Sequence, residues 1–166
     1  MERLLVLRHV PLFSEMTLDQ LEAINKIASE QHYVKGHVIF REGALGSDLF
    51  LVVEGKVRIV KDIDTPEEAT LCVLGSGSYF GEMAILDDEP RSASVIVEQD
   101  VQLLTLDGDS LKELVLEMPE IAFEIFRVLT GRVRVSEQRV KELKAVIDST
   151  PATAEKTPPN SKGPRS

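Results

Sequence analysis

The sequence predicts a mainly β protein with flanking helices, of the α+β class, whose strands form an antiparallel roll or sandwich. Short runs of β-type residues follow one another from Gln31 to Asp107, with turn residues between them. Seven of the ten glycines fall between Gly36 and Gly81, the close spacing that turns between short strands require. Helical patterns precede and follow this region, so we expect helices on both sides of it.

The first segment, residues 1–30, is expected to be helical. Thr17 and Gln20 have the spacing of a capping box, in which each side chain accepts a hydrogen bond from the other residue's backbone N–H. They predict a helix from this point to about Ala28. Its apolar residues have helical spacing: Leu18, Leu21, Ile24 and Ile27.

The β region, residues 31–109, is expected to contain an acidic hairpin loop and a buried thiol. The acidic run from Asp62 to Glu68 includes Pro66 and is typical of a solvated hairpin loop. Cys72 is the only cysteine, so no disulfide can form within the chain. It lies in an apolar run, and we expect it to be a small core residue.

Residues 110–147 are expected to form two helices. Ser110 and Glu113 suggest a second capping box, and Pro119 suits the first turn of the long helix that follows. Apolar residues at three- and four-residue spacing mark this helix: Phe126, Leu129, Val133, Val140, Leu143 and Ile147. The pattern favours a homodimer through residues 126–147, and the alternative is packing against the chain's own strands.

The remaining residues, 148–166, contain four of the eight prolines together with Ser, Thr and Lys, and predict a disordered tail. A formal net charge of -9 argues against a nucleic-acid partner, because phosphate backbones are bound by an excess of Lys and Arg. No apolar run approaches the ~18 residues that a membrane span requires. We therefore expect a cytoplasmic protein without a membrane partner.

Residues 80–95 contain the pattern of a small anion site. Gly81 opens a short turn where backbone N–H groups can converge on an oxyanion, and Arg91 offers a guanidinium fork that binds phosphate with two parallel bonds. Glu82 accepts hydrogen bonds only, so it requires a donor such as a hydroxyl. A ribose phosphate carries both groups. The alternative is an ion pair between Glu82 and Arg91 that only fastens the loop.

The sequence gives little support for a metal site or for an enzyme active site. The acidic run from Asp87 to Glu89 is expected to be a solvated loop rather than a metal site, since consecutive acids converge poorly on one ion. The three histidines lack ligand spacing, and no nucleophile is paired with a base in the pattern. The sequence therefore predicts neither a metal site, nor a cofactor, nor an enzyme.

Residues 80–95 resemble the phosphate-binding cassette of the cyclic-nucleotide-binding domain family, which includes the regulatory subunit of protein kinase A, the bacterial catabolite activator and cyclic-nucleotide-gated channels. A weaker resemblance runs from about Arg3 to about Leu143. It implies a β-roll of the jelly-roll type with a long C-terminal helix. It also implies the ligand contacts: Glu82 on the ribose 2′-hydroxyl, Arg91 on the cyclic phosphate, Gly81 in the turn, and the amides near Met83, Ala84 and Ser92 around the phosphate.

The resemblance leaves the base less defined. Ser136 corresponds to a hydroxyl residue on the long helix that contacts adenine in the catabolite activator, and it also fills the polar gap in the apolar pattern of that helix. Other family members cap the base with an arginine or an apolar residue, for which Arg132, Arg139 or Leu129 could serve. Ser92 is compatible with either base, and we favour cyclic AMP over cyclic GMP.

Two functions follow as hypotheses. In the first, the chain is a cyclic-nucleotide sensor in which ligand binding moves the C-terminal helix and signals to an unidentified effector protein or domain. In the second, the same fold is a dimerisation or docking module that binds no nucleotide.

Overall fold

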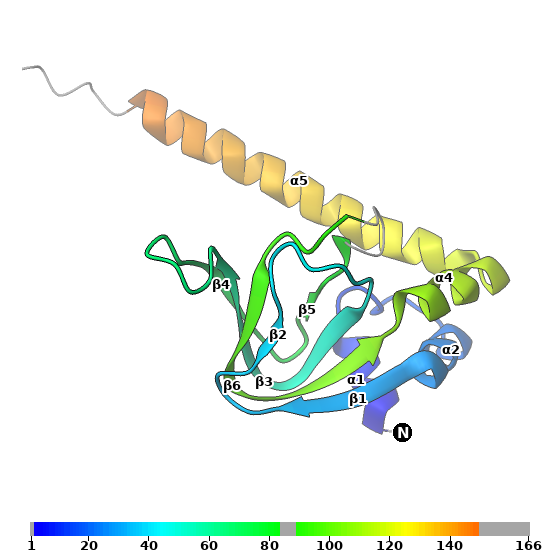
Figure 1. The fold of residues 1–166 in the computed structure, drawn as a ribbon. Helices are drawn as coiled ribbons and strands as arrows, with labels where there is room; N and C mark the ends of the chain where they lie inside the picture. The colour runs from blue at the N-terminus through cyan, green and yellow to red at the C-terminus, as the bar shows by residue number, and fades with distance from the viewer. Residues whose placement is uncertain (1, 84–88, 150–166) are drawn as a thin grey trace, which may run out of the picture. The chain divides into compact units, whose positions relative to one another are not determined.

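The computed structural model describes residues 2–83 and 89–149 as an antiparallel sheet with flanking helices, which confirms the predicted fold class (Figure 1). Helices α1 (Glu2–His9) and α2 (Leu18–Ile27) come first. The strands follow as β1 (Ala28–Tyr33), β2 (Val38–Phe40), β3 (Leu49–Lys61), β4 (Ala69–Gly75), β5 (Tyr79–Phe80) and β6 (Ser94–Leu106). Helices α4 (Gly108–Glu117) and α5 (Glu120–Ser149) end the described part, and the predicted tail of residues 148–166 lies almost wholly outside it.

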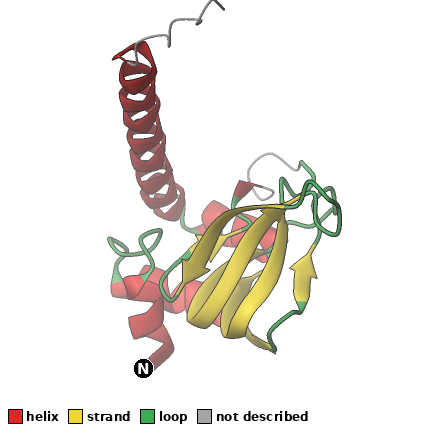
Figure 2. Ribbon diagram, turned by 90° about the vertical axis from the view of Figure 1, so that its left-hand side faces the viewer, coloured by secondary structure: helices red, strands yellow, loops and turns green. Residues whose placement is uncertain are grey.

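The chain divides into two compact units, Met1–Leu129 and Thr130–Ser166, so α5 begins in one and ends in the other. In the first unit the strands form a curved sheet with the order β1-β6-β3-β4, while β2 pairs with β6 and β5 pairs with β3 (Figure 2). Strands β3 and β6 are long. Each contains two of the short β-type runs that the sequence analysis treated as separate strands. Register shifts around Glu54 allow β3 to remain paired with β6 across Gly55.

Both faces of the central strands are buried, and alternate residues enter two different cores. On β3, Leu49 and Leu51 join a core with α1, α2 and α4, whereas Phe50 and Val52 join a core inside the roll. Strand β6 alternates in the same way. This two-sided burial is confined to residues 49–52 of β3 and 103–106 of β6, where the sequence is largely apolar, whereas Glu54 and Asp100 are exposed.

The helix starts were predicted correctly in one case and wrongly in the other. Thr17 and Gln20 form the predicted capping box of α2, with the Thr17 N–H donating to Gln20 Oε1 at 2.8 Å. The predicted box at Ser110 is wrong, because Asp107 is the N-cap of α4 and its carboxylate accepts from the Ser110 N–H at 2.9 Å. An aspartate directly after the last strand caps the helix before Ser110 is reached.

The prediction that Cys72 is a core residue is also wrong, because Cys72 is exposed. It lies on β4, which pairs only with β3 among the described strands and therefore forms an edge of the sheet. Its neighbours Leu71 and Val73 are 58% and 52% exposed. An apolar run does not distinguish a central strand from an edge strand.

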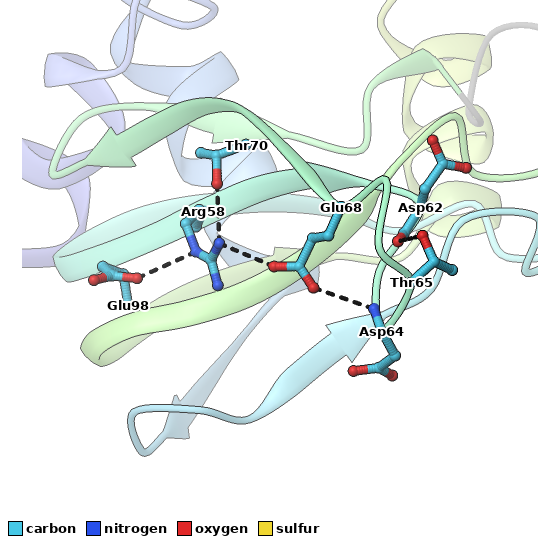
Figure 3. A network of polar contacts seen from close by, with 7 residues as sticks. All are labelled: Arg58, Asp62, Asp64, Thr65, Glu68, Thr70 and Glu98. Atoms are coloured by element: carbon cyan, nitrogen blue, oxygen red, sulfur yellow. Dashed lines mark hydrogen bonds and ion pairs between the residues drawn. The ribbon is translucent and has the colours of Figure 1, made fainter.

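The acidic segment 62–68 forms the predicted loop of the β3–β4 hairpin, and a polar network holds it (Figure 3). Arg58 on β3 donates to Thr70 Oγ1 at 2.9 Å and to Glu68 at 3.3 Å, and it forms an ion pair with Glu98 on β6. Glu68 also accepts the Asp64 N–H. One guanidinium thus ties three segments of the roll together at this hairpin.

We expect Gly55→Ala to destabilise the fold more than Gly36→Ala. Both glycines have a positive φ, +85° and +86°, so alanine at either position costs about 1–3 kcal/mol of backbone strain. At Gly55 the new Cβ would also lie 2.0 Å from the Asp100 carbonyl oxygen, while at Gly36 it meets nothing within 4 Å. Urea unfolding of the two variants measures the difference, and equal losses in the free energy of unfolding would contradict the clash at Gly55.

Candidate functional site

The predicted anion site lies between β5 and β6, and its turn begins at Gly81. Gly81 has φ +88°, and a Cβ there would lie 2.6 Å from the Asp48 carbonyl oxygen and 2.7 Å from Arg91 Nη1. Only glycine combines this conformation with such close contacts. The turn therefore brings Gly81 and Arg91 together, while Ala84, Asp87 and Asp88 lie outside the described residues.

Arg91 is buried, with only 6% of its surface exposed. Its guanidinium lies over the Phe40 ring, 4.3 Å from the ring centroid, and Nη1 donates to the Gly81 carbonyl at 3.1 Å. Its backbone is fixed as well, since its N–H donates to the Ala44 carbonyl at 2.9 Å and its carbonyl accepts from the Gly43 N–H at 2.8 Å. The arginine fork is thus held by protein contacts of both its side chain and its backbone.

Electrostatics at the site centre on the Arg91 guanidinium and the Asp48 carboxyl. Burial lowers the pKa of Arg91, because desolvation disfavours the charged form, and the negative charge of Asp48 acts in the opposite direction. Burial raises the pKa of the Asp48 carboxyl, while Arg91 lowers it and Asp107 raises it further. A second anion near Arg91 would stabilise a cation that its surroundings desolvate.

The other predicted contacts surround this centre. Glu82 is half-buried next to Gly81, and Met83 and Ser92 are exposed. The Ser92 hydroxyl lies 4.0 Å from Met83 Sδ, so the two ends of the turn meet at these residues. Gly81 and Arg91 are therefore in contact and the two ends of the turn meet, while the contact of Glu82 with a ribose stays a prediction.

The predicted base contacts lie on α5. Leu129 belongs to the first unit and is half-buried. Ser136 and Arg139 are exposed in the second unit, and the side chain of Arg132 lies outside the described residues. Their contact with a base stays a prediction.

Sequence reasoning missed the residues that enclose Arg91. Phe40 lies under the guanidinium, a Cβ at Gly46 would lie 3.4 Å from Nη2, and Asp48 supplies the opposing charge. The three come from the end of β2 and the loop before β3, about fifty residues upstream in the chain. The signal in the sequence was the pair Gly43 and Gly46 just before Asp48, which indicated more than a turn between strands.

Comparison with known families agrees with this geometry. The family model described as "Cyclic nucleotide-binding domain" matches residues 30–118, more than half of the chain. This chain belongs to the cyclic nucleotide-binding domain family. The matched range includes the roll, the cassette and α4, so the predicted resemblance is confirmed, and the chain carries a cyclic nucleotide-binding regulatory domain.

Relatives of this cyclic nucleotide-binding domain occur in proteins of different kinds. A cGMP-dependent protein kinase of Drosophila melanogaster is 37% identical over 118 residues, which are 69% of this chain and 13% of the kinase. A CRP-like cAMP-activated global transcriptional regulator of Mycobacterium tuberculosis is 28% identical over 83% of this chain and 62% of the regulator. The chain thus spans only part of the length of these relatives.

Among solved structures, the regulatory domain of Toxoplasma gondii PKA with cAMP is similar to the cyclic nucleotide-binding domain described here. The TM-score is 0.63 at 29% identity, over 68% of this chain and 43% of that one. Within the described ranges 2–83 and 89–149, no helix is long and apolar enough to cross a membrane.

We expect Gly81→Ala to weaken cyclic-nucleotide binding at least tenfold, a loss of about 1.4 kcal/mol, because its Cβ would displace the Arg91 fork. Gly36→Ala is the matched control. It introduces the same left-handed strain, at φ +86°, but its Cβ meets nothing within 4 Å, and its backbone N–H donates to Val97 and not to Arg91. Calorimetric titration measures both affinities, and equal affinities in the two variants would contradict this role of Gly81.

Proposed function

We propose that this chain is a non-enzymatic cyclic-nucleotide sensor that holds the cyclic phosphate on Arg91 and the ribose 2′-hydroxyl on Glu82. Gly81, Met83, Ala84 and Ser92 complete the phosphate site. In this proposal residues 31–109 bind the nucleotide, the helices of residues 110–147 respond to it, and an unidentified effector reads the response. Cyclic AMP is the preferred ligand.

The observation that carries the proposal is the buried, pre-positioned guanidinium of Arg91. Desolvating a cation is costly unless an anion or hydrogen-bond acceptors compensate it. The Gly81 carbonyl and the Phe40 ring hold the guanidinium, and Asp48 compensates its charge in part. A bound phosphate would complete the compensation at little entropic cost, because the fork is already oriented.

Packing at the start of α4 supports a coupling between the phosphate site and the helices. A Cβ on Gly108, the first residue of α4, would lie 2.5 Å from the Ser47 carbonyl oxygen, so the helix start contacts the loop beside Asp48. Asp107, the N-cap of α4, also raises the pKa of Asp48. A ligand that changes the balance between Arg91 and Asp48 therefore acts next to the end of α4. Such a ligand shifts the helix only if it binds one helix position more tightly.

The preference for cyclic AMP is supported by the predicted contact of Ser136 with adenine. It is also supported by the relatives whose names include cAMP, although the Drosophila kinase is named for cGMP. Exposed apolar residues on α5, among them Val133, Val140 and Leu143, support the proposed homodimer through residues 126–147. Sedimentation velocity measures that association.

Arg91→Lys is expected to lose at least about tenfold in cyclic-nucleotide affinity, since lysine keeps the charge but neither the two-bond fork nor the flat stack on Phe40. Thermal unfolding with ligand provides the first measurement. A ligand at a hundred times its dissociation constant should add about 2.7 kcal/mol to the wild-type stability.

In the Arg91→Lys variant this increment should largely disappear at the same ligand concentration. Arg41→Lys, at an exposed arginine paired with Asp64, is the control and should keep it. Stability unchanged by cyclic AMP and by cyclic GMP in the wild type would instead favour the docking module.

Titration of the wild type and of Ser136→Ala with both nucleotides tests the base preference. The wild type should bind cyclic AMP more tightly than cyclic GMP. Removing one hydrogen bond of about 1 kcal/mol should lower the cyclic AMP affinity about fivefold and leave that of cyclic GMP nearly unchanged. An equal loss for both nucleotides would remove Ser136 from base recognition.

A further inference from the structure

An apolar groove in the first unit shares Glu82 with the proposed ribose phosphate site and Leu129 with the predicted base contacts. It has a volume of about 340 Å³ and lies between α4 and the beginning of α5, with Leu12 and Leu49 among the residues that line it. Leu111 and Val115 line it from α4, and Ala122 lines it from α5. Of the eleven described residues that line it, nine are apolar, and the other two are Glu82 and Lys112.

The size of the groove suits a small molecule. Binding sites for small ligands are typically concave, largely apolar and about 300–1,000 Å³ in volume, with a few polar groups that orient the ligand. Taking ~30 Å³ for each water-sized unit, the groove accommodates at least about ten non-hydrogen atoms. Leu116 and Phe126 on its lining are 81% and 55% exposed, so its mouth is open to solvent.

The two polar lining residues carry opposite charges, and this determines the class of ligand. A carboxylate or an ammonium group would be attracted by one of these two charges and repelled by the other, so it would gain little net electrostatic stabilisation to offset its desolvation. An uncharged end group that can hydrogen-bond, such as an N–H or a hydroxyl, is compatible with both.

We propose that this groove is a second ligand site, which binds a small uncharged apolar molecule with one hydrogen-bonding end group. The apolar body lies along Leu111, Val115 and Ile125, and the end group faces Glu82 and Lys112. Because Glu82 is also the proposed ribose contact, occupancy of the groove changes the affinity for the nucleotide. That coupling, unlike the site itself, rests on the proposed function.

N-phenyl-1-naphthylamine is a suitable probe, since it is uncharged, carries a single N–H and fluoresces strongly in apolar surroundings. Titrated into the full chain, it should bind saturably with one molecule per chain, and 1-decanol should displace it. Ala122→Phe fills the groove and should weaken probe binding at least about tenfold. Ala145→Phe places the same larger side chain on an exposed position of α5 outside the groove and should leave binding unchanged.

Leu116→Gln gives a second variant that cannot fail by disturbing the core, because Leu116 is exposed, and it should also weaken binding. Absence of saturable binding, or equal binding in wild type and Ala122→Phe with native circular dichroism in both, would overturn the proposal.

The coupling has its own measurement. Saturating cyclic AMP should change the probe affinity by at least about threefold, and saturating probe should change the cyclic AMP affinity by the same factor, since linkage is reciprocal. Probe binding without any cyclic AMP binding would refute the proposed function and leave the second site standing. Cyclic AMP binding without probe binding would do the reverse.

Discussion

The buried guanidinium of Arg91 is the constraint on which the architecture of the site depends. It requires an aromatic face beneath it, which Phe40 provides, and a glycine beside it, because a side chain at position 81 would occupy the place of Nη1. Its backbone also pairs with the loop of residues 43–44. The roll thus joins segments from β2, the loop before β3 and the cassette around one cation, and the local shape follows from that packing.

The two cores explain how a small domain can hold such a cation rigidly. Alternate residues of β3 anchor the sheet to the helices on one face and to the roll interior on the other. Phe50 and Phe80, which stack in the inner core with their centroids 5.0 Å apart, also enclose the side of the roll where Arg91 lies. The position of the guanidinium is therefore set by these aromatic rings together with its hydrogen bond to the Gly81 carbonyl and the backbone pairing with residues 43–44.

Several residues with contacts on two sides bring the proposed phosphate site close to the helices. Ser47 contacts the first residue of α4, Asp48 interacts with Arg91, and Glu82 lines both the cassette and the apolar groove. In a packed protein such shared residues make two sites energetically dependent on each other. A cyclic nucleotide and an apolar ligand would then both act on the start of α4.

The sequence alone determined the fold class, the capping box of α2 and the hairpin loop of residues 62–68, because these depend on periodicity and on short spacings along the chain. The missed N-cap at Asp107 was a local error, since Asp107 lies only three residues before Ser110. The sequence also did not place Cys72 at a sheet edge, or Phe40 and Asp48 around the guanidinium. Those features depend on which strands become neighbours, and strand pairing joins residues about fifty positions apart that no local pattern connects. Only the tertiary structure showed that the Arg91 guanidinium at the predicted anion turn is buried and held by its neighbours. Only the tertiary structure also revealed the apolar groove, which shares Glu82 with that turn.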